Sequence, residues 1–311
     1  MNNLMAPRDM FGKTIVEIGQ HNENIFVLSG DLGGATKVND FGKAFPERFV
    51  NTGIAEQNMV SMAAGLERMG YIPIVSTFCC FAPGRTYDQI RQSVAYSNAN
   101  VKIMSTHPGL AIGMDGAIHQ SLDDLALMRA LPNFTVLAPS DEIETKKAIE
   151  WAINHKGPVY IRVGRKECEK YFNENWEIEI GKSYELKEGK DITLIAHGAI
   201  VPFMMKAAHE LAKEDIDARV ISFPFIKPVD KEAIIKAAKE TKGIVTGEDH
   251  FLNGGLFSIV SEVVCHNAPC KVRGIGVNDT FGESGAPEDL YKKYGLTVEN
   301  IIKEVKNILG V

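Results

Sequence analysis

Short runs of apolar and β-branched residues alternate along the chain with longer segments whose apolar positions recur at helical spacing. Such runs predict strands, and such segments predict helices. In the first half, the predicted strands cover residues 25–28, 72–75, 101–104, 135–137 and 159–163, and the predicted helices cover 7–18, 55–69, 85–96, 122–129 and 141–154. Strands separated by helices in this way are typical of βαβ units, so we expect an α/β domain with a mostly parallel sheet flanked by helices.

The alternation lapses between residues 167 and 190, where charged and aromatic residues follow each other without a period. Beyond this segment it resumes, with predicted strands over 192–196, 218–221, 243–245 and 271–273, and predicted helices over 201–214, 231–240, 255–264 and 298–309. We therefore expect two α/β domains, over residues 1–166 and 191–311, joined by a linker over 167–190.

Composition narrows the class of protein. The chain has 311 residues, of which 45% are hydrophobic and 24% are charged, so it can form two ordinary globular cores. A net charge of −6, without a run of basic residues, argues against nucleic-acid or anionic-membrane binding. The first nine residues lack the pattern of a signal peptide, and no apolar run is long enough to span a membrane. Five cysteines without C-x-x-C spacing favour a reducing compartment, so we expect a cytoplasmic protein.

One acidic residue stands at a distinctive position. Glu56 follows the short β-like run 48–50 and the turn residue Gly53, and it opens the apolar helical pattern of residues 55–69. It is therefore predicted in the first turn of a helix. A carboxylate there interacts favourably with the helix dipole, so helix electrostatics alone is one explanation and a functional carboxylate is the other.

Polar loops follow four of the predicted strands in the first half. They comprise residues 30–36, 76–81, 105–109 with its continuation to 120, and 164–165. Because ligands bind beyond the carboxyl ends of strands in open α/β sheets, we expect these loops to form a site. No nucleotide-phosphate motif is present, and His107, Asp115 and His119 lack the spacing of a metal site, so we expect no metal ligands in this chain.

In combination, these motifs resemble a known family. The run 52–58, Ser76-Thr77-Phe78 with Phe81, and His107 with the run 115–120 resemble the pyrimidine-binding domain of transketolase. In the second half, Gly247-Glu248-Asp249-His250, Gly254-Gly255 and Phe281-Gly282-Glu283-Ser284-Gly285 resemble the transketolase C-terminal domain. The resemblance covers essentially the whole chain. It implies a thiamine diphosphate-binding fold of pyrimidine type, followed by a transketolase C-terminal domain.

One part of a complete transketolase is not matched. The family's diphosphate-binding domain carries a Gly-Asp-Gly motif and a downstream Asn that hold Mg²⁺, and Gly30-Asp31-Leu32 departs from that motif. The resemblance therefore implies the C-terminal subunit of a split transketolase. Such a subunit would form a dimer, would be active only with an N-terminal-half subunit in a heterotetramer, and would leave Mg²⁺ mainly to that partner.

The resemblance also implies roles for residues in cofactor binding. Glu56 would hydrogen-bond the pyrimidine ring of thiamine diphosphate and favour the tautomer that removes the thiazolium proton. Phe78 and Phe81 would form an apolar wall for that ring. Asp31, in the loop after the first strand, is included among the expected cofactor-binding residues. Glu56, His107 and His119 are the expected catalytic residues.

Substrate contacts follow from the same resemblance. His107, Asp115 and His119 would contact the sugar hydroxyls. Arg8 and Arg165, with His107 nearby, correspond to the residues at the phosphate end, where arginine offers bidentate hydrogen bonds. A serine of the family's phosphate site is replaced here by Ala35. The implied reaction transfers a two-carbon ketol unit from a ketose phosphate to an aldose phosphate, as in pentose phosphate metabolism.

Three other interpretations remain open at this point. The runs 115–120 and 85–89 also resemble 1-deoxy-D-xylulose-5-phosphate synthase. The β subunit of a 2-oxoacid dehydrogenase has the same order of two domains, although its glutamate motif differs. A non-catalytic paralogue that binds a partner is the third, and the presence of Glu56, His107 and His119 argues against it.

Overall fold

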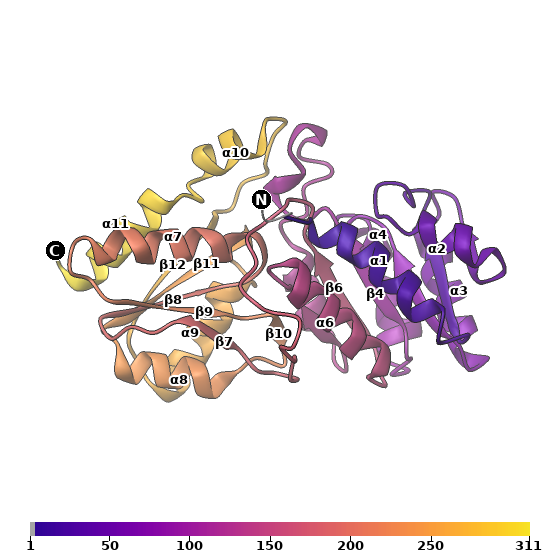
Figure 1. Ribbon diagram of the computed structural model, residues 1–311, viewed down its shortest axis with the longest axis horizontal. Coiled ribbons are helices and arrows are strands. Elements are labelled where there is room, and N and C mark those ends of the chain that lie inside the picture. The colour runs from indigo at the N-terminus through magenta and orange to yellow at the C-terminus, as the bar shows by residue number, and fades with distance from the viewer. Residues whose placement is uncertain (1–3) are drawn as a thin grey trace.

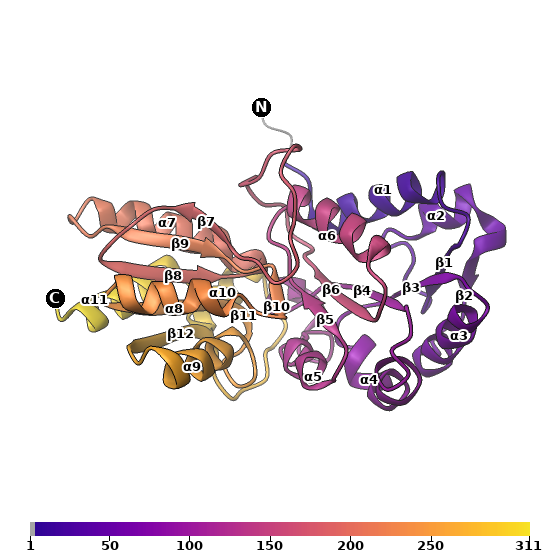
Figure 2. The same cartoon turned by 90° about the horizontal axis from the view of Figure 1, so that it is seen from below.

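The computed structural model describes residues 4–311. Residues 1–3, with which the expected first domain begins, lie outside the described residues. Two sheets lie side by side, each with helices on both faces (Figures 1 and 2). The first half of the chain, from indigo to magenta, forms most of one, and the second half, from orange to yellow, forms the other. The predicted fold class, two α/β domains with mostly parallel sheets, is confirmed.

The first sheet has seven strands in the order β10-β5-β6-β4-β3-β1-β2, and only the β10–β5 pair is antiparallel. Helices α1, α2 and α6 cover one face, and α3, α4 and α5 cover the other (Figure 2). The strands are β1 (Ile25–Ser29), β2 (Phe49–Asn51), β3 (Ile72–Ser76), β4 (Lys102–Thr106), β5 (Thr135–Leu137), β6 (Val159–Val163) and β10 (Phe225–Lys227). The helices are α1 (Pro7–Gly19), α2 (Asn39–Ala44), α3 (Glu56–Arg68), α4 (Ala82–Gln89), α5 (Asp124–Ala130) and α6 (Glu142–Asn154), with shorter helical segments η1 (Pro46–Arg48), η2 (Ile90–Ala95) and η3 (Leu110–Asp115).

The second sheet has five strands in the order β12-β11-β8-β9-β7, and only β7 is antiparallel to its neighbour. Helices α7 and α11 pack on one face, and α8 and α9 on the other (Figure 1). The strands are β7 (Tyr184–Lys187), β8 (Ile192–Ala196), β9 (Ala218–Ser222), β11 (Gly243–Phe251) and β12 (Lys271–Val277). The helices are α7 (Val201–Ala212), α8 (Lys231–Glu240), α9 (Leu256–Asn267), α10 (Pro287–Tyr294) and α11 (Val298–Leu309), and the short η4 (Gly198–Ile200) precedes α7.

Two short strands differ from the expected division of the chain. β7 lies inside the segment 167–190 that we expected to be a linker. β10 comes from the second half but completes the edge of the first sheet beside β5. Both strands pair in antiparallel fashion at a sheet edge, where backbone hydrogen bonds and not an apolar run determine the pairing. The second half of the chain therefore contributes to the first sheet.

The central strands explain the apolar runs. Every residue of β4, β6 and β8 is buried, because helices cover both faces of each sheet. The parallel strands β1, β3, β4 and β6 place their carboxyl ends at one edge, so the four polar loops of the sequence meet there. Across residues 4–311, none of the helices has the length and apolar character that crossing a membrane requires.

Candidate functional site

Glu56 lies at the start of α3, as predicted, just beyond the left-handed turn at Gly53 (φ 71°). Its side chain is only 1% exposed, which is unusual for a carboxylate. The loop after β1 approaches it closely, because a Cβ added to Gly30 would lie 3.3 Å from Glu56 Cγ. Glu56 is thus held between the carboxyl end of β1 and its own helix, away from water.

A second helix supplies the counter-ion. Arg85 of α4 donates from Nη1 to both Glu56 oxygens, at 2.9 and 2.8 Å. Its guanidinium also lies over the Phe81 ring, with Cζ 4.2 Å from the centroid. This pair was not predicted from the sequence. The two residues are 29 positions apart on different helices, and no local pattern connects them.

An aromatic cluster of Phe78, Phe81, His107 and His119 stands beside this ion pair. The two phenylalanine rings are nearly parallel, with centroids 6.0 Å apart and an angle of 13°. The His107 ring lies 4.1 Å from Phe78, and His119 meets Phe81 edge-on at 5.5 Å. The structure therefore brings together four residues that the sequence placed in two different loops.

His107 is held by both ring nitrogens. Its Nε2 accepts a hydrogen bond from Arg8 Nη1 at 3.1 Å, so the proton belongs on Nδ1, which lies 2.7 Å from Thr106 Oγ1. Burial, helped by the charges of Arg8 and Arg165, lowers the pKa of His107 to about 3. Its backbone is left-handed (φ 61°), a conformation that is uncommon for residues other than glycine. His107 is therefore a neutral, fixed imidazole.

The two predicted phosphate-end arginines lie together at the start of α1 and the end of β6. Arg8 N donates to Gly164 O at 3.0 Å, which places Arg8 beside Arg165. Arg165 donates to the carbonyl of Ile112 and lies 3.7 Å from Asp115 Oδ2. Among the residues described, Arg8 Nε is buried and has no hydrogen-bond partner. Arg8, His107, Arg165 and Asp115 thus form one continuous polar surface next to the aromatic cluster.

Asp31 and His119 occupy the two margins of this surface. His119 Nδ1 donates to Asp115 O at 3.2 Å, and the ring is half-buried. Asp31 is exposed at the end of β1, and its carboxylate accepts from Asn51 Nδ2 at 3.0 Å. The role of Asp31 in cofactor binding stays a prediction.

The second domain fixes the loop that carries the histidines, here called the site loop (residues 107–120). Asp249 Oδ1 accepts from Leu110 N at 2.9 Å, and Oδ2 accepts from Ala111 N at 3.3 Å. Tyr291 of α10 donates to the same Oδ2 at 2.8 Å. Gly109 (φ 65°) allows the approach, since an added Cβ would collide with the Asp249 carboxylate. The sequence analysis cited Asp249 only within a family motif and missed this contact.

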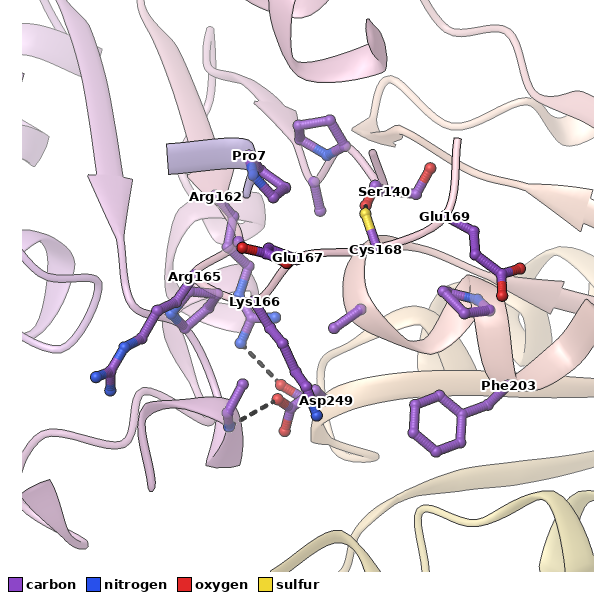
Figure 3. A pocket seen from close by; sticks show the side chains of 18 of the residues that line it. Pro7, Ser140, Arg162, Arg165, Lys166, Glu167, Cys168, Glu169, Phe203 and Asp249 are labelled. Carbon is purple, nitrogen blue, oxygen red and sulfur yellow. Dashed lines mark hydrogen bonds between the residues drawn. The ribbon is translucent and has the colours of Figure 1, made fainter. Parts of the chain in front are cut away.

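A cavity of about 260 Å³ lies between the domains, behind Arg165 (Figure 3). Arg162 of β6 points toward Asp249 in this view, and its Nη2 donates to Asp249 O at 2.8 Å. Arg165, Lys166, Cys168 and Phe203 also line the cavity, whereas Glu56 and the aromatic cluster do not. The cavity is thus separate from the predicted cofactor site. Over the described part of the chain, no three His, Cys, Asp or Glu side chains are grouped so that they could hold a metal ion.

Comparison with known proteins gives the family. The model of the transketolase pyrimidine binding domain matches residues 4–170, and that of the transketolase C-terminal domain matches residues 181–301. A Methanocaldococcus jannaschii protein, provisionally named a transketolase C-terminal section, is 45% identical over 96% of this chain and 94% of its own length. A 6-deoxy-6-sulfo-D-fructose transketolase subunit from Clostridium sp. is 38% identical over 97% of this chain and 94% of its own.

A solved structure described as a split gene transketolase, an inactive beta4 tetramer, is similar throughout. Its TM-score is 0.90, its sequence is 44% identical, and the match covers 99% of both chains. The ordered motifs, the two α/β domains and these matches agree. This chain therefore belongs to the transketolase family, of which it comprises the pyrimidine-binding and C-terminal domains.

Proposed function

We propose that this chain is the C-terminal subunit of a split, thiamine diphosphate-dependent transketolase. It transfers a two-carbon ketol unit from a ketose phosphate to an aldose phosphate once an N-terminal-half subunit completes the site. The observation that carries the proposal is a buried carboxylate, Glu56, beside the parallel rings of Phe78 and Phe81.

The residues around Glu56 fit an aminopyrimidine. Such a ring needs an apolar face to stack on and polar atoms at its edge. Phe81 presents a ring face, and Glu56 offers two carboxylate oxygens next to it. The Thr77 hydroxyl, close to Glu56 across Gly30, is buried and has no partner among the described residues. The Arg85 guanidinium, a planar group that both stacks on Phe81 and donates to Glu56, supports this fit.

Each residue of the site has a definite task in this proposal. Bound thiamine diphosphate supplies the carbon nucleophile of the transfer. Glu56 holds the pyrimidine through a hydrogen bond to a ring nitrogen and exchanges a proton at that atom. His107 is neutral, and Arg8 and Thr106 engage both of its ring nitrogens, so it does not act as an acid at neutral pH. It would contact a sugar hydroxyl by exchanging one of these two partners for the substrate. His119, at the margin, is free to move a proton to or from a sugar oxygen.

The two arginines Arg8 and Arg165 suit the phosphate group of a sugar substrate. Arg8 and Arg165 approach from two elements, and Arg8 Nε is a buried donor without a partner among the described residues. Arginine binds phosphate through paired hydrogen bonds, so these two side chains would fix the substrate's far end. Asp115, 3.7 Å from Arg165, keeps that guanidinium in place and contacts a hydroxyl.

Exposed apolar side chains near the site support the proposal that a partner subunit binds there. Ile54 precedes Glu56 by two residues and is 77% exposed, and Ile118 beside His119 is 81% exposed. Met114 of the site loop and Phe281 of the second domain are exposed to a similar extent. Grouped apolar side chains around a polar site are typical of a protein interface. The similar split-gene subunit is described as an inactive tetramer. We therefore propose that this chain also self-associates, and that its partner holds the diphosphate and Mg²⁺ in an α2β2 assembly.

A coupled ketol-transfer assay tests the proposal. Xylulose 5-phosphate and ribose 5-phosphate are supplied with thiamine diphosphate and Mg²⁺ to this chain alone, to the N-terminal-half subunit alone, and to their mixture. We expect transfer only in the mixture. A fourth reaction, with pyruvate and glyceraldehyde 3-phosphate in the mixture, distinguishes the deoxyxylulose-phosphate synthase chemistry. Transfer from pyruvate but not from the ketose phosphate would replace the proposed activity, and no turnover in any tube would contradict it.

A further inference from the structure

Arg85 makes two contacts that together reproduce what an aminopyrimidine would need. Its Nη1 donates to both oxygens of Glu56, at 2.9 and 2.8 Å. Its guanidinium plane lies on Phe81, with Cζ 4.2 Å from the ring centroid. A flat group that stacks on this ring and donates to this carboxylate occupies the volume in which a ring held by the same two residues would have to lie.

The position of Arg85 in α4 allows its side chain to move away from Glu56. It belongs to the first turns of α4, where its backbone N–H bonds to Phe81 O at 3.3 Å and its carbonyl accepts from Gln57 Nε2 of α3 at 3.2 Å. These contacts hold the backbone, and the side chain reaches Glu56 separately. That side chain is 43% exposed, whereas Glu56 is 1% exposed. The carboxylate is therefore fixed and the guanidinium is the movable member of the pair. A buried carboxylate without a counter-ion or hydrogen-bond donor is unfavourable, so Arg85 stays until another donor replaces it.

We infer that Arg85 is a placeholder for the cofactor's pyrimidine. It holds Glu56 in position, and it withdraws into solvent when a pyrimidine ring stacks on Phe81 and bonds to Glu56. This inference rests on the proposed function, since it concerns the same subsite. As a consequence, Arg85 competes with the cofactor. The apparent affinity for the cofactor equals the intrinsic affinity multiplied by the fraction of time that Arg85 is withdrawn.

The test compares thiamine diphosphate affinity among matched variants. Isothermal titration calorimetry, with Mg²⁺ present, is performed on the mixture of this chain with the N-terminal-half subunit. Arg85→Ala removes the competitor, and Arg85→Lys keeps the charge but lacks the flat guanidinium. Arg91→Ala is the control, because Arg91 is an exposed arginine of the adjoining segment η2 and its loss changes the net charge equally. Circular dichroism melting confirms that each variant is folded.

If Arg85 is withdrawn about a tenth of the time, Arg85→Ala binds the cofactor roughly tenfold more tightly than the unchanged chain. The cofactor affinity of Arg85→Lys should lie between those of Arg85→Ala and the unchanged chain. Arg91→Ala should bind the cofactor as tightly as the unchanged chain or slightly more weakly. Equal or weaker binding by folded Arg85→Ala would overturn the inference, since Arg85 would then be a lasting partner of Glu56 in the loaded site. Failure of every mixture, the unchanged one included, to bind thiamine diphosphate would instead contradict the proposed function.

Discussion

Glu56 is a carboxylate that the fold removes from water and pairs with a single guanidinium. Structural ion pairs are usually better exposed, because desolvation of a charge is costly unless something compensates for it. Its position at the junction of α3 and the end of β1 places it where ligands bind in α/β sheets. We interpret its burial as the requirement of a group that must exchange a proton with a bound ring.

Replacement of Glu56 by Gln tests that interpretation. The amide keeps the shape of the side chain but cannot carry the proton, so turnover should fall by roughly 10² to 10⁴. The measurement is kcat in the coupled assay with the partner subunit. Glu67→Gln, near the other end of α3, is the matched control and should keep its activity. A Glu56→Gln enzyme within a few-fold of the unchanged one would remove Glu56 from proton transfer.

His107 should make stability depend on pH. Its pKa is about 3 in the folded protein and 6.5 when unperturbed, so the unfolded chain binds more protons between these values. The free energy of unfolding should therefore fall as the pH drops from about 6.5 toward 3, by at most about 1.4 kcal/mol per pH unit from this residue. Urea denaturation at several pH values measures this effect.

His107→Gln isolates the contribution, because glutamine does not titrate. As the pH drops, the free energy of unfolding of this variant should decline less steeply than that of the unchanged chain. His21→Gln, at an exposed site, should decline as steeply as the unchanged chain. Identical slopes for the His107 variant and the unchanged chain would mean that His107 is not buried in its neutral form.

At the residue scale, the sequence indicated Glu56, Phe78, Phe81 and the two histidines, because they lie in loops after predicted strands or at a helix start and because their motifs resemble transketolase. It could not indicate that Arg85 pairs with Glu56. The position lies in a helical run, and only the packing of α4 against α3 turns its side chain toward Glu56. Pairings between elements depend on side-chain directions that periodicity does not contain.

At the scale of elements, the site loop depends on the other domain. Gly109, Gly113 and Gly116 all have positive φ, so the loop turns sharply three times around η3. Its N-terminal amides, at Leu110 and Ala111, bond to Asp249 at the end of β11. The sequence predicted a polar loop that continues to residue 120. The partner 139 residues away could not be predicted, because nothing in the local pattern indicates which carboxylate satisfies those amides.

Asp249→Asn should loosen this attachment. The amide nitrogen cannot accept a hydrogen bond, so at least one of the bonds to Leu110, Ala111 or Tyr291 is lost in a buried place. We expect the free energy of unfolding to fall by about 1–3 kcal/mol, measured by urea denaturation. Tyr294→Phe, on the same helix as Tyr291, is the control and should cost less than about 0.5 kcal/mol. A stability change no larger than that of the control would show that Asp249 does not hold the loop.

The elements themselves were largely predictable. Long amphipathic segments and buried apolar strands appear where their periods place them, because burial on both faces of a parallel sheet leaves a clear pattern. β7 and β10 were not predicted, since three- and four-residue strands at a sheet edge carry no readable period. α2 and α10 were also missed. Both are short, and each lies in a polar stretch.

For the whole molecule, the open face around Glu56 is the important feature. The exposed side chains of Ile54 and Ile118 flank the site on two loops. Ile118→Asp should therefore weaken association with the N-terminal-half subunit at least tenfold without altering the melting temperature of the isolated chain. Tyr96→Asp is the control, because Tyr96 is 86% exposed near the amino end of β4, at the opposite edge of the sheet. Analytical ultracentrifugation of the mixtures measures the effect, and equal association of both variants would place the interface elsewhere.

The most direct measurement is a crystal structure of the assembled pair of subunits with thiamine diphosphate and Mg²⁺. The account predicts that the pyrimidine ring stacks on Phe81 and that one ring nitrogen lies about 2.6–3.2 Å from a Glu56 oxygen. We also expect the diphosphate and metal on the partner subunit, and Arg8 and Arg165 at the phosphate end of a bound sugar substrate. A cofactor bound elsewhere, with Glu56 out of hydrogen-bond reach of its pyrimidine, would contradict the central claim.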